Sequence, residues 1–157
     1  MNWAHVHLII NHFPVIGTSG AILLLVYSMV RKSEEVKMVS FGAFAIIALI
    51  TISVYFTGEA AEKVVKDIPG VTETYIGRHE EIASLTLILM EILGAASLAG
   101  LVLLRRSGAI PKWVVCMILV LALITDAAVN LTANLGGQIR HTEIRGNAGS
   151  QASPGSR

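Results

Sequence analysis

The stretch Trp113 to Leu135 reads WVVCMILVLALITDAAVNLTANL, and Asp126 is its only charged residue. A helix needs about 20 predominantly apolar residues to cross the roughly 30 Å hydrocarbon core of a bilayer. Three earlier stretches have the same character: Leu8 to Val30, Met38 to Thr57 and Ile82 to Leu104. Lipid offers no hydrogen bonds to an exposed backbone, so each stretch is expected to be helical. The sequence therefore predicts an all-α membrane protein, a four-transmembrane-helix bundle.

The composition agrees with this fold class. Of the 157 residues 54% are hydrophobic, and the mean hydropathy is +0.67, whereas soluble domains are about 45–50% apolar. We expect one transmembrane domain over residues 1–145 and a disordered Gly- and Ser-rich tail over residues 146–157. Between the second and third stretches, residues 58–66 have apolar side chains at helical spacing. They predict a short surface helix, which Pro69-Gly70 would end.

Two short connections, residues 31–37 and 105–112, concentrate the basic residues. They hold half of the 12 Lys and Arg residues: Arg31, Lys32, Lys37, Arg105, Arg106 and Lys112. Such a density in short loops favours the cytoplasmic side. Both termini are therefore expected outside (N-out and C-out) in a multi-pass membrane protein. Membrane lipid is the expected surrounding, and no nucleic-acid partner is expected.

All five histidines fall on the outer side of the predicted membrane. They are His5, His7, His12, His79 and His141. Three of them, His12, His79 and His141, stand near the ends of different helices, so their imidazoles should reach a similar depth. Imidazole groups at this depth can ligate haem, ligate a bare metal ion, or form hydrogen bonds at the membrane interface.

Haem ligation is the first interpretation. His12 shares a helix face with His5, seven residues earlier, whereas His7 points elsewhere. His12 can then face the bundle and pair with His79 as the axial ligands of a b-type haem. A second haem could use His7 and His141, and His5 is a further candidate ligand.

Two arginines stand next to histidines in the sequence. Arg78 and Arg140 can pair with haem propionates, or they can anchor helix ends among lipid headgroups. The single cysteine, Cys116, excludes a Cys-x-x-Cys-His haem attachment and any cluster held by several cysteines.

A bare-metal site is an alternative for the same region. Glu59 and Glu80 are expected at the level of His79 and His141, and carboxylate with imidazole can bind zinc, iron or copper. A solvated acidic loop explains the same residues without a metal.

Polar residues also interrupt the apolar stretches. Glu91 lies near the middle of the third stretch, and Asp126 and Asn130 lie one turn apart on the fourth. Ionisable groups at such depth usually face the bundle interior or a water-filled cavity. They predict a proton path or a polar quinone pocket; interhelical hydrogen bonds are the other interpretation.

Four segments carry a resemblance to a known family. They read HVHLIINHFPVIG (5–17), TGEAA (57–61), RHE (78–80) and GGQIRHTEI (136–144). With these His-Phe-Pro and Ile-Arg-His motifs, the chain up to Arg145 resembles an uncharacterised family of bacterial four-span membrane proteins. The resemblance implies a location in the bacterial inner (cytoplasmic) membrane. Related His-Phe-Pro domains are sometimes joined to Rieske-type iron-sulfur domains. The resemblance thus implies membrane electron transfer and a haem, with any Rieske-type or cytochrome partner on a separate chain.

These observations predict a membrane b-type cytochrome subunit that carries electrons between quinol and a periplasmic acceptor. One or two haems b would be held by the histidines near the outer face. Such a chain would act as an electron-transfer subunit of a complex or homo-oligomer rather than as a stand-alone enzyme. The alternatives are a non-haem metal-binding protein for sensing or metal handling, and a cofactor-free scaffold subunit of a membrane complex.

Overall fold

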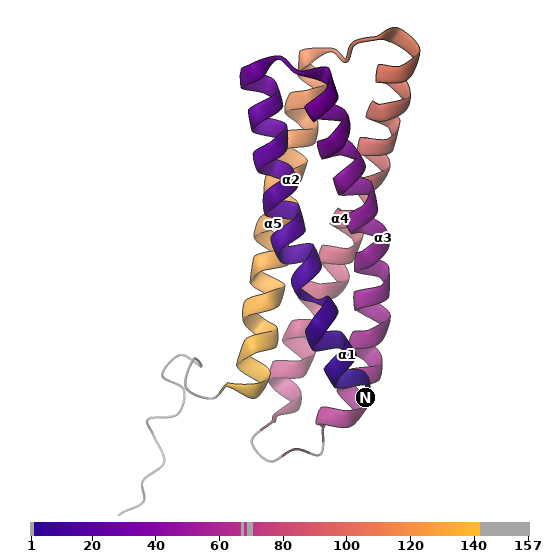
Figure 1. The fold of residues 1–157 in the computed structure, drawn as a ribbon. Coiled ribbons are helices and arrows are strands. Elements are labelled where there is room, and N and C mark those ends of the chain that lie inside the picture. Colours follow the sequence, from indigo (N-terminus) through magenta and orange to yellow (C-terminus); the bar gives the residue numbers. More distant parts are fainter. Residues whose placement is uncertain (1, 67, 69–70, 142–157) are drawn as a thin grey trace, which may run out of the picture.

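The fold consists of long helices that run along one another (Figure 1). A computed structural model describes residues 2–66, 68 and 71–141. Its helices are α1 (Trp3–Ile10), α2 (His12–Arg31), α3 (Glu34–Val65), α4 (Glu73–Ser107) and α5 (Lys112–Arg140). Four segments are long and apolar enough to cross a membrane, and α1 and α2 together form the first of them. The predicted four-transmembrane-helix bundle is confirmed, and the chain is a multi-pass membrane protein.

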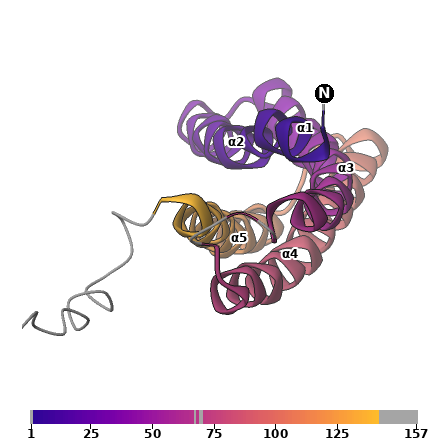
Figure 2. The ribbon, with the colours of Figure 1, turned by 90° about the horizontal axis from the view of Figure 1, so that it is seen from below.

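The first transmembrane segment is broken at Asn11, between α1 and α2. Pro14 explains the break, because proline has no N–H to donate to the carbonyl of Ile10 and its ring crowds that carbonyl. Below the break α1 turns toward α3 and away from the line of α2 (Figures 1 and 2). Among the described residues α2 packs against both α3 and α5, whereas α1 packs mainly against α3 and makes no close backbone contact with α5.

The bundle core is apolar and closely packed. Five large side chains in it are fully buried: Leu25, Phe41, Phe44, Met90 and Leu93. Small residues bring α3 and α4 together, since a Cβ atom added to Gly94 would stand 2.5 Å from the Cβ atom of Ala48. Close approach of this kind is typical of helices packed within membranes. Many large apolar side chains point outward instead, as expected for a surface that faces lipid.

The helices extend beyond the membrane. The 32 residues of α3 measure about 48 Å at 1.5 Å per residue, whereas the hydrocarbon core is about 30 Å thick. The predicted separate surface helix at residues 58–66 is wrong, because α3 continues without a break through Val65. Glu62, Lys66 and Glu80 thus lie on helix ends outside the membrane-spanning segments 38–57 and 82–104. The expected turn at Pro69-Gly70 and the expected disordered tail lie outside the described residues.

The two ends of the bundle differ. The α2–α3 and α4–α5 connections lie at one end, and α1 begins at the other end, where α5 finishes (Figure 1). Each connection starts from a left-handed residue, Lys32 with φ 53° and Gly108 with φ 73°, a common way to end a helix. Ser33 then caps α3 by accepting a hydrogen bond from the backbone N–H of Val36. Short connections therefore join α2 to α3 and α4 to α5 at the end of the bundle that carries the basic residues.

Candidate functional site

A cavity of about 1070 Å³ lies at the end of the bundle where α1 begins. Residues from all five helices line it, and its lining is mostly apolar. All five histidines are among the lining residues. The structure therefore brings the predicted histidines to one cavity, although it gives them different environments.

His7 is held against α3. Its Nδ1 lies 3.1 Å from the carbonyl oxygen of Val54 and 3.3 Å from Oγ1 of Thr57. A carbonyl oxygen can only accept, so Nδ1 carries the proton and donates it. The ring lies against Gly58, where an added Cβ atom would stand 3.2 Å from Cε1 of His7. The half-buried His7 is thus fixed in one tautomer, with Nε2 as its lone-pair nitrogen.

His79 is held in the same way between α4 and α5. Its Nδ1 donates to the carbonyl oxygen of Thr132 at 3.0 Å. Its ring lies against Gly136, where an added Cβ atom would stand 3.1 Å from Cε1. The side chain of Thr132 is itself fixed by a 2.8 Å hydrogen bond with Thr86 of α4. His79 is also half-buried and also keeps a free lone pair on Nε2.

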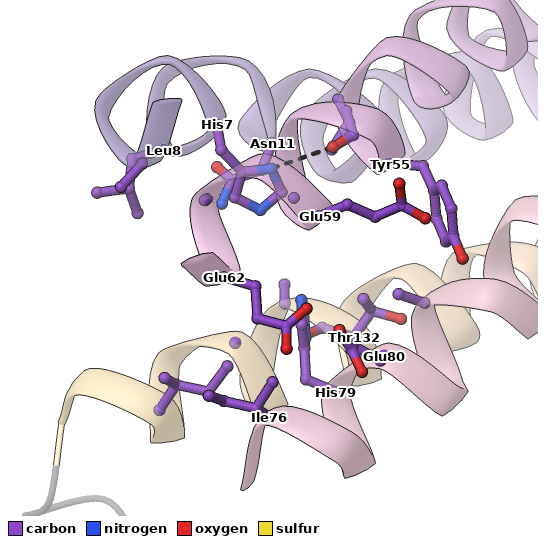
Figure 3. A pocket seen from close by; sticks show the side chains of 18 of the residues that line it. His7, Leu8, Asn11, Tyr55, Glu59, Glu62, Ile76, His79, Glu80 and Thr132 are labelled. Carbon is purple, nitrogen blue, oxygen red and sulfur yellow. Dashed lines mark hydrogen bonds between the residues drawn. The ribbon is translucent and has the colours of Figure 1, made fainter. Parts of the chain in front are cut away.

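The two histidine sites follow one plan. In each, the imidazole donates to a carbonyl on the neighbouring helix and packs on a glycine four residues after that carbonyl. His7 and His79 come from opposite walls of the cavity (Figure 3). The structure therefore presents two matched lone pairs to one cavity.

The other three histidines are more exposed. His12 begins α2, and its Nδ1 donates to the carbonyl oxygen of Leu8 in the preceding turn at 2.9 Å. His5 lies on α1, where its backbone N–H donates to Oδ1 of Asn2. His141 forms the end cap of α5. All three side chains line the cavity, and the hydrogen bonds described for His5 and His12 stay within the first transmembrane segment and its N-cap, Asn2.

The predicted propionate and metal residues occupy different places. Arg78 is exposed, and the side chain of Arg140 lies outside the described residues. Glu59 and Glu80 line the cavity from α3 and α4. In the described ranges 2–66, 68 and 71–141, no group of three His, Cys, Asp or Glu side chains is arranged to hold a metal ion.

A carboxyl pair lies at the mouth of the cavity, beside His79 (Figure 3). Glu62 of α3 and Glu80 of α4 share a hydrogen bond, and Nζ of Lys66 lies 2.5 Å from Oε1 of Glu62. The hydrogen bond to Glu62 raises the pKa of Glu80 to about 7, together with partial burial and the charge of Glu62. The same hydrogen bond and Lys66 lower the pKa of Glu62. Below about pH 7 the pair therefore holds a single proton, which Glu80 donates to Glu62.

The polar residues predicted to form a path do not line this cavity. Asp126 joins α5 to α2, because Ser19 donates to its Oδ1 at 2.8 Å. Asn130 donates to the other carboxyl oxygen of Asp126 at 3.1 Å. Glu91 is half-buried, and its Oε1 has no hydrogen-bond partner among the described residues. Asp126 therefore takes part in an interhelical hydrogen bond, whereas Asn130 bonds to Asp126 within its own helix.

Sequence reasoning missed several parts of the site. Gly58 and Gly136 belong to the resembling segments TGEAA and GGQIRHTEI, but nothing in the sequence pairs them with histidines on other helices. Asn11, next to His12, lines the cavity with a buried Oδ1 atom that has no hydrogen-bond partner in the described part of the chain. The backbone carbonyls of Val54 and Thr132 carry no sequence signal at all.

Comparison with known proteins adds no relative to this description. No family model matches the chain, and no curated protein or solved structure matches it significantly. The function is therefore argued from the geometry of the cavity.

Proposed function

We propose that this chain is a membrane b-type cytochrome subunit, with haem held between His7 and His79. The observation that carries the proposal is the matched pair of imidazoles, each fixed through Nδ1 to a backbone carbonyl of a neighbouring helix. Donation from Nδ1 sets the tautomer and ring orientation that leave Nε2 for a metal. Two opposed imidazoles are the protein ligands of a low-spin b-type haem.

The residues around the cavity fit this group. A volume of about 1070 Å³ is at the upper end of the roughly 300–1,000 Å³ usual for small-molecule sites. Gly58 and Gly136 let the two rings lie close against helix backbones. When bound, haem supplies a carrier for one electron at a time. The chain's own residues set the ligand geometry and surround the cofactor with apolar side chains.

The proposal revises the ligand assignment expected from sequence. His79 is retained, whereas His7 replaces His12, because His12 is exposed and its Nδ1 is bonded within its own segment. One haem is proposed in place of one or two. Among the described residues no three-ligand metal cluster occurs, and haem needs only the two imidazoles. A scaffold role would give no reason for two matched histidine sites.

The proposed setting is the bacterial inner membrane, with both termini outside. The support is the basic composition of the 31–37 and 105–112 connections, which lie opposite the cavity. The cavity would then stand near the periplasmic face. Electrons would pass from a membrane quinol to a periplasmic acceptor, such as a cytochrome or Rieske-type subunit on another chain. The small chain would act within a complex or homo-oligomer.

The test is an absorption spectrum of the detergent-purified protein, oxidised and then reduced with dithionite, with haem supplied during expression. We expect a Soret band and sharp reduced α and β bands. His7→Ala and His79→Ala should each abolish the low-spin spectrum, while the matched change His5→Ala should preserve it. A well-folded protein that takes up no haem would overturn the proposal, and unchanged spectra in both variants would overturn the ligand assignment.

A further inference from the structure

The cavity has a side that the helices do not close. Deeper in the bundle, Ser19 of α2 donates a hydrogen bond of 2.8 Å to Asp126 of α5, and this bond joins the two helices. On the N-terminal side of Asn11, α1 turns toward α3. The described residues of α1 and α5 therefore make no close backbone contact. Leu8 and His12 line this side from α1 and the start of α2, and both are exposed. Ala133 and Gly137 line it from α5, where their small size leaves the space open.

Two hydrogen-bond acceptors line the cavity where α1 meets α2. Oδ1 of Asn11 is buried and has no partner among the described residues. The neighbouring His12 donates from Nδ1 to the carbonyl oxygen of Leu8, so its Nε2 is an acceptor in the neutral imidazole. A buried acceptor without a donor is costly, and a molecule in the cavity that supplies an O–H or N–H group would satisfy it.

The surroundings restrict the class of that ligand. The cavity lining is mostly apolar and opens sideways from a transmembrane bundle, which suits a molecule dissolved in the membrane. Glu59, Glu62 and Glu80 also line the cavity, so a phosphate headgroup would meet carboxyl groups of its own charge. An uncharged head with hydroxyl donors and an apolar tail satisfies both conditions.

We propose that a membrane-soluble hydroquinone enters between α1 and α5, and that its hydroxyl groups donate to Oδ1 of Asn11 and Nε2 of His12. The role of this hydroquinone as electron donor rests on the proposed function. The inference adds the site at which the donor binds. The site prefers the hydroquinone to the quinone, because the quinone carries carbonyl oxygens and has no hydroxyl to donate. The ring would lie beside the cavity wall that holds His7.

The first test compares binding of reduced and oxidised decylubiquinone to the full chain in lipid nanodiscs, under anaerobic conditions. Bound ligand is extracted and quantified above that of matched empty nanodiscs. We expect the reduced form to bind more tightly, and Asn11→Leu and His12→Phe each to weaken its binding roughly tenfold, the usual effect of losing one hydrogen bond. The matched control is Asn134→Leu, which changes an exposed amide on α5 and should leave binding unaltered.

The second test addresses the route of entry. Ala133→Phe should fill the opening between α5 and α1. It should weaken binding of the reduced form at least as much as Asn11→Leu and His12→Phe do. Ala127→Phe makes the same exchange at an exposed position on α5 that does not line the cavity, and it should have no effect. Wild-type, Ala133→Phe and Ala127→Phe proteins are compared at equal folded fraction, judged by helix content and gel filtration.

The outcomes separate this inference from the haem assignment. Equal binding of quinol and quinone, unaffected by Asn11→Leu and His12→Phe, would overturn the quinol site even if haem is bound. A phospholipid that stays in the cavity against excess quinol would also overturn it. Quinol binding with the expected variant effects in a protein that takes up no haem would support the site and reject the cytochrome proposal.

Discussion

The ring of His79 rests on the backbone of Gly136, and a Cβ atom added to that glycine would stand 3.1 Å from Cε1 of the ring. The ring has little freedom to move away, because its Nδ1 is hydrogen-bonded to Thr132 on the same face of α5. Residues 132 and 136 are one helical turn apart, so one turn of α5 supplies both the hydrogen-bond acceptor and the backbone on which the ring packs. His7 has the same relation to Val54 and Gly58.

Gly136→Ala should therefore disturb the position of His79. The methyl group must displace the ring, and such overpacking costs about 1–3 kcal/mol. We expect a lower melting temperature in detergent and a haem spectrum that is weakened or shifted. Gly77→Ala is the control, because a Cβ atom at Gly77 meets nothing within 4 Å and alanine favours a helix. If both variants behave alike, the contact between His79 and Gly136 does not determine the ring position.

The carboxyl pair predicts that the local stability of the outer ends of α3 and α4 depends on pH. The pKa of Glu80 in the folded protein is about 7, above its ordinary value of 4.5. The folded state thus binds this proton more tightly than the unfolded chain does. Its contribution to stability is complete below pH 4.5 and is lost as the pH rises through about 7. Hydrogen exchange of backbone amides near Glu62 and Glu80 should accelerate over this range, after correction for intrinsic rates.

Glu80→Gln should remove most of this dependence, since a glutamine side chain keeps a donor for Glu62 at every pH. Glu81→Gln changes the neighbouring exposed residue and should leave the pH profile as in the wild type. An identical profile in the wild type and in Glu80→Gln would show that another group is responsible.

The hydrogen bond between Ser19 and Asp126 should contribute to bundle stability. Ser19→Ala removes the donor that joins α2 to α5. Interhelical hydrogen bonds in membranes contribute about 0.6 kcal/mol on average, so a loss of this size in the free energy of unfolding is expected. Ser53→Ala, at an exposed position of α3, serves as the comparison. Equal unfolding curves for the two variants would show that the bond between α2 and α5 has no net effect.

The sequence predicts the helices well for a physical reason. A membrane requires about 20 apolar residues in succession, and the four stretches meet this requirement without reference to one another. The helix ends outside the membrane are harder to predict. Residues 58–66 have helical periodicity, but no local signal separates a new helix from an extension of α3, and the extension is what occurs.

The arrangement within the site is harder still to predict. Parity places all five histidines on one side, and they do line one cavity. The selection of His7 over His12 depends on the break at Asn11, which turns α1 against α3 and so presents His7 to Val54. A helical wheel drawn through residues 3–30 without the break gives His7 another direction. Pro14 is the signal for this break, but it does not specify which way α1 turns.

The direction of α1 leads to the last prediction. Pro14→Ala restores an N–H group that can donate to the carbonyl of Ile10, so α1 should straighten into line with α2 and approach α5. The distance between spin labels at Ala4→Cys and Asn134→Cys, in a Cys116→Ser background, should then shorten, and quinol binding should fall as the opening narrows. An unchanged distance would show that packing of α1 on α3 holds the break without help from the proline. The packing of α1 on α3 would then maintain the opening between α1 and α5, and substitutions on α3 would be needed to close it.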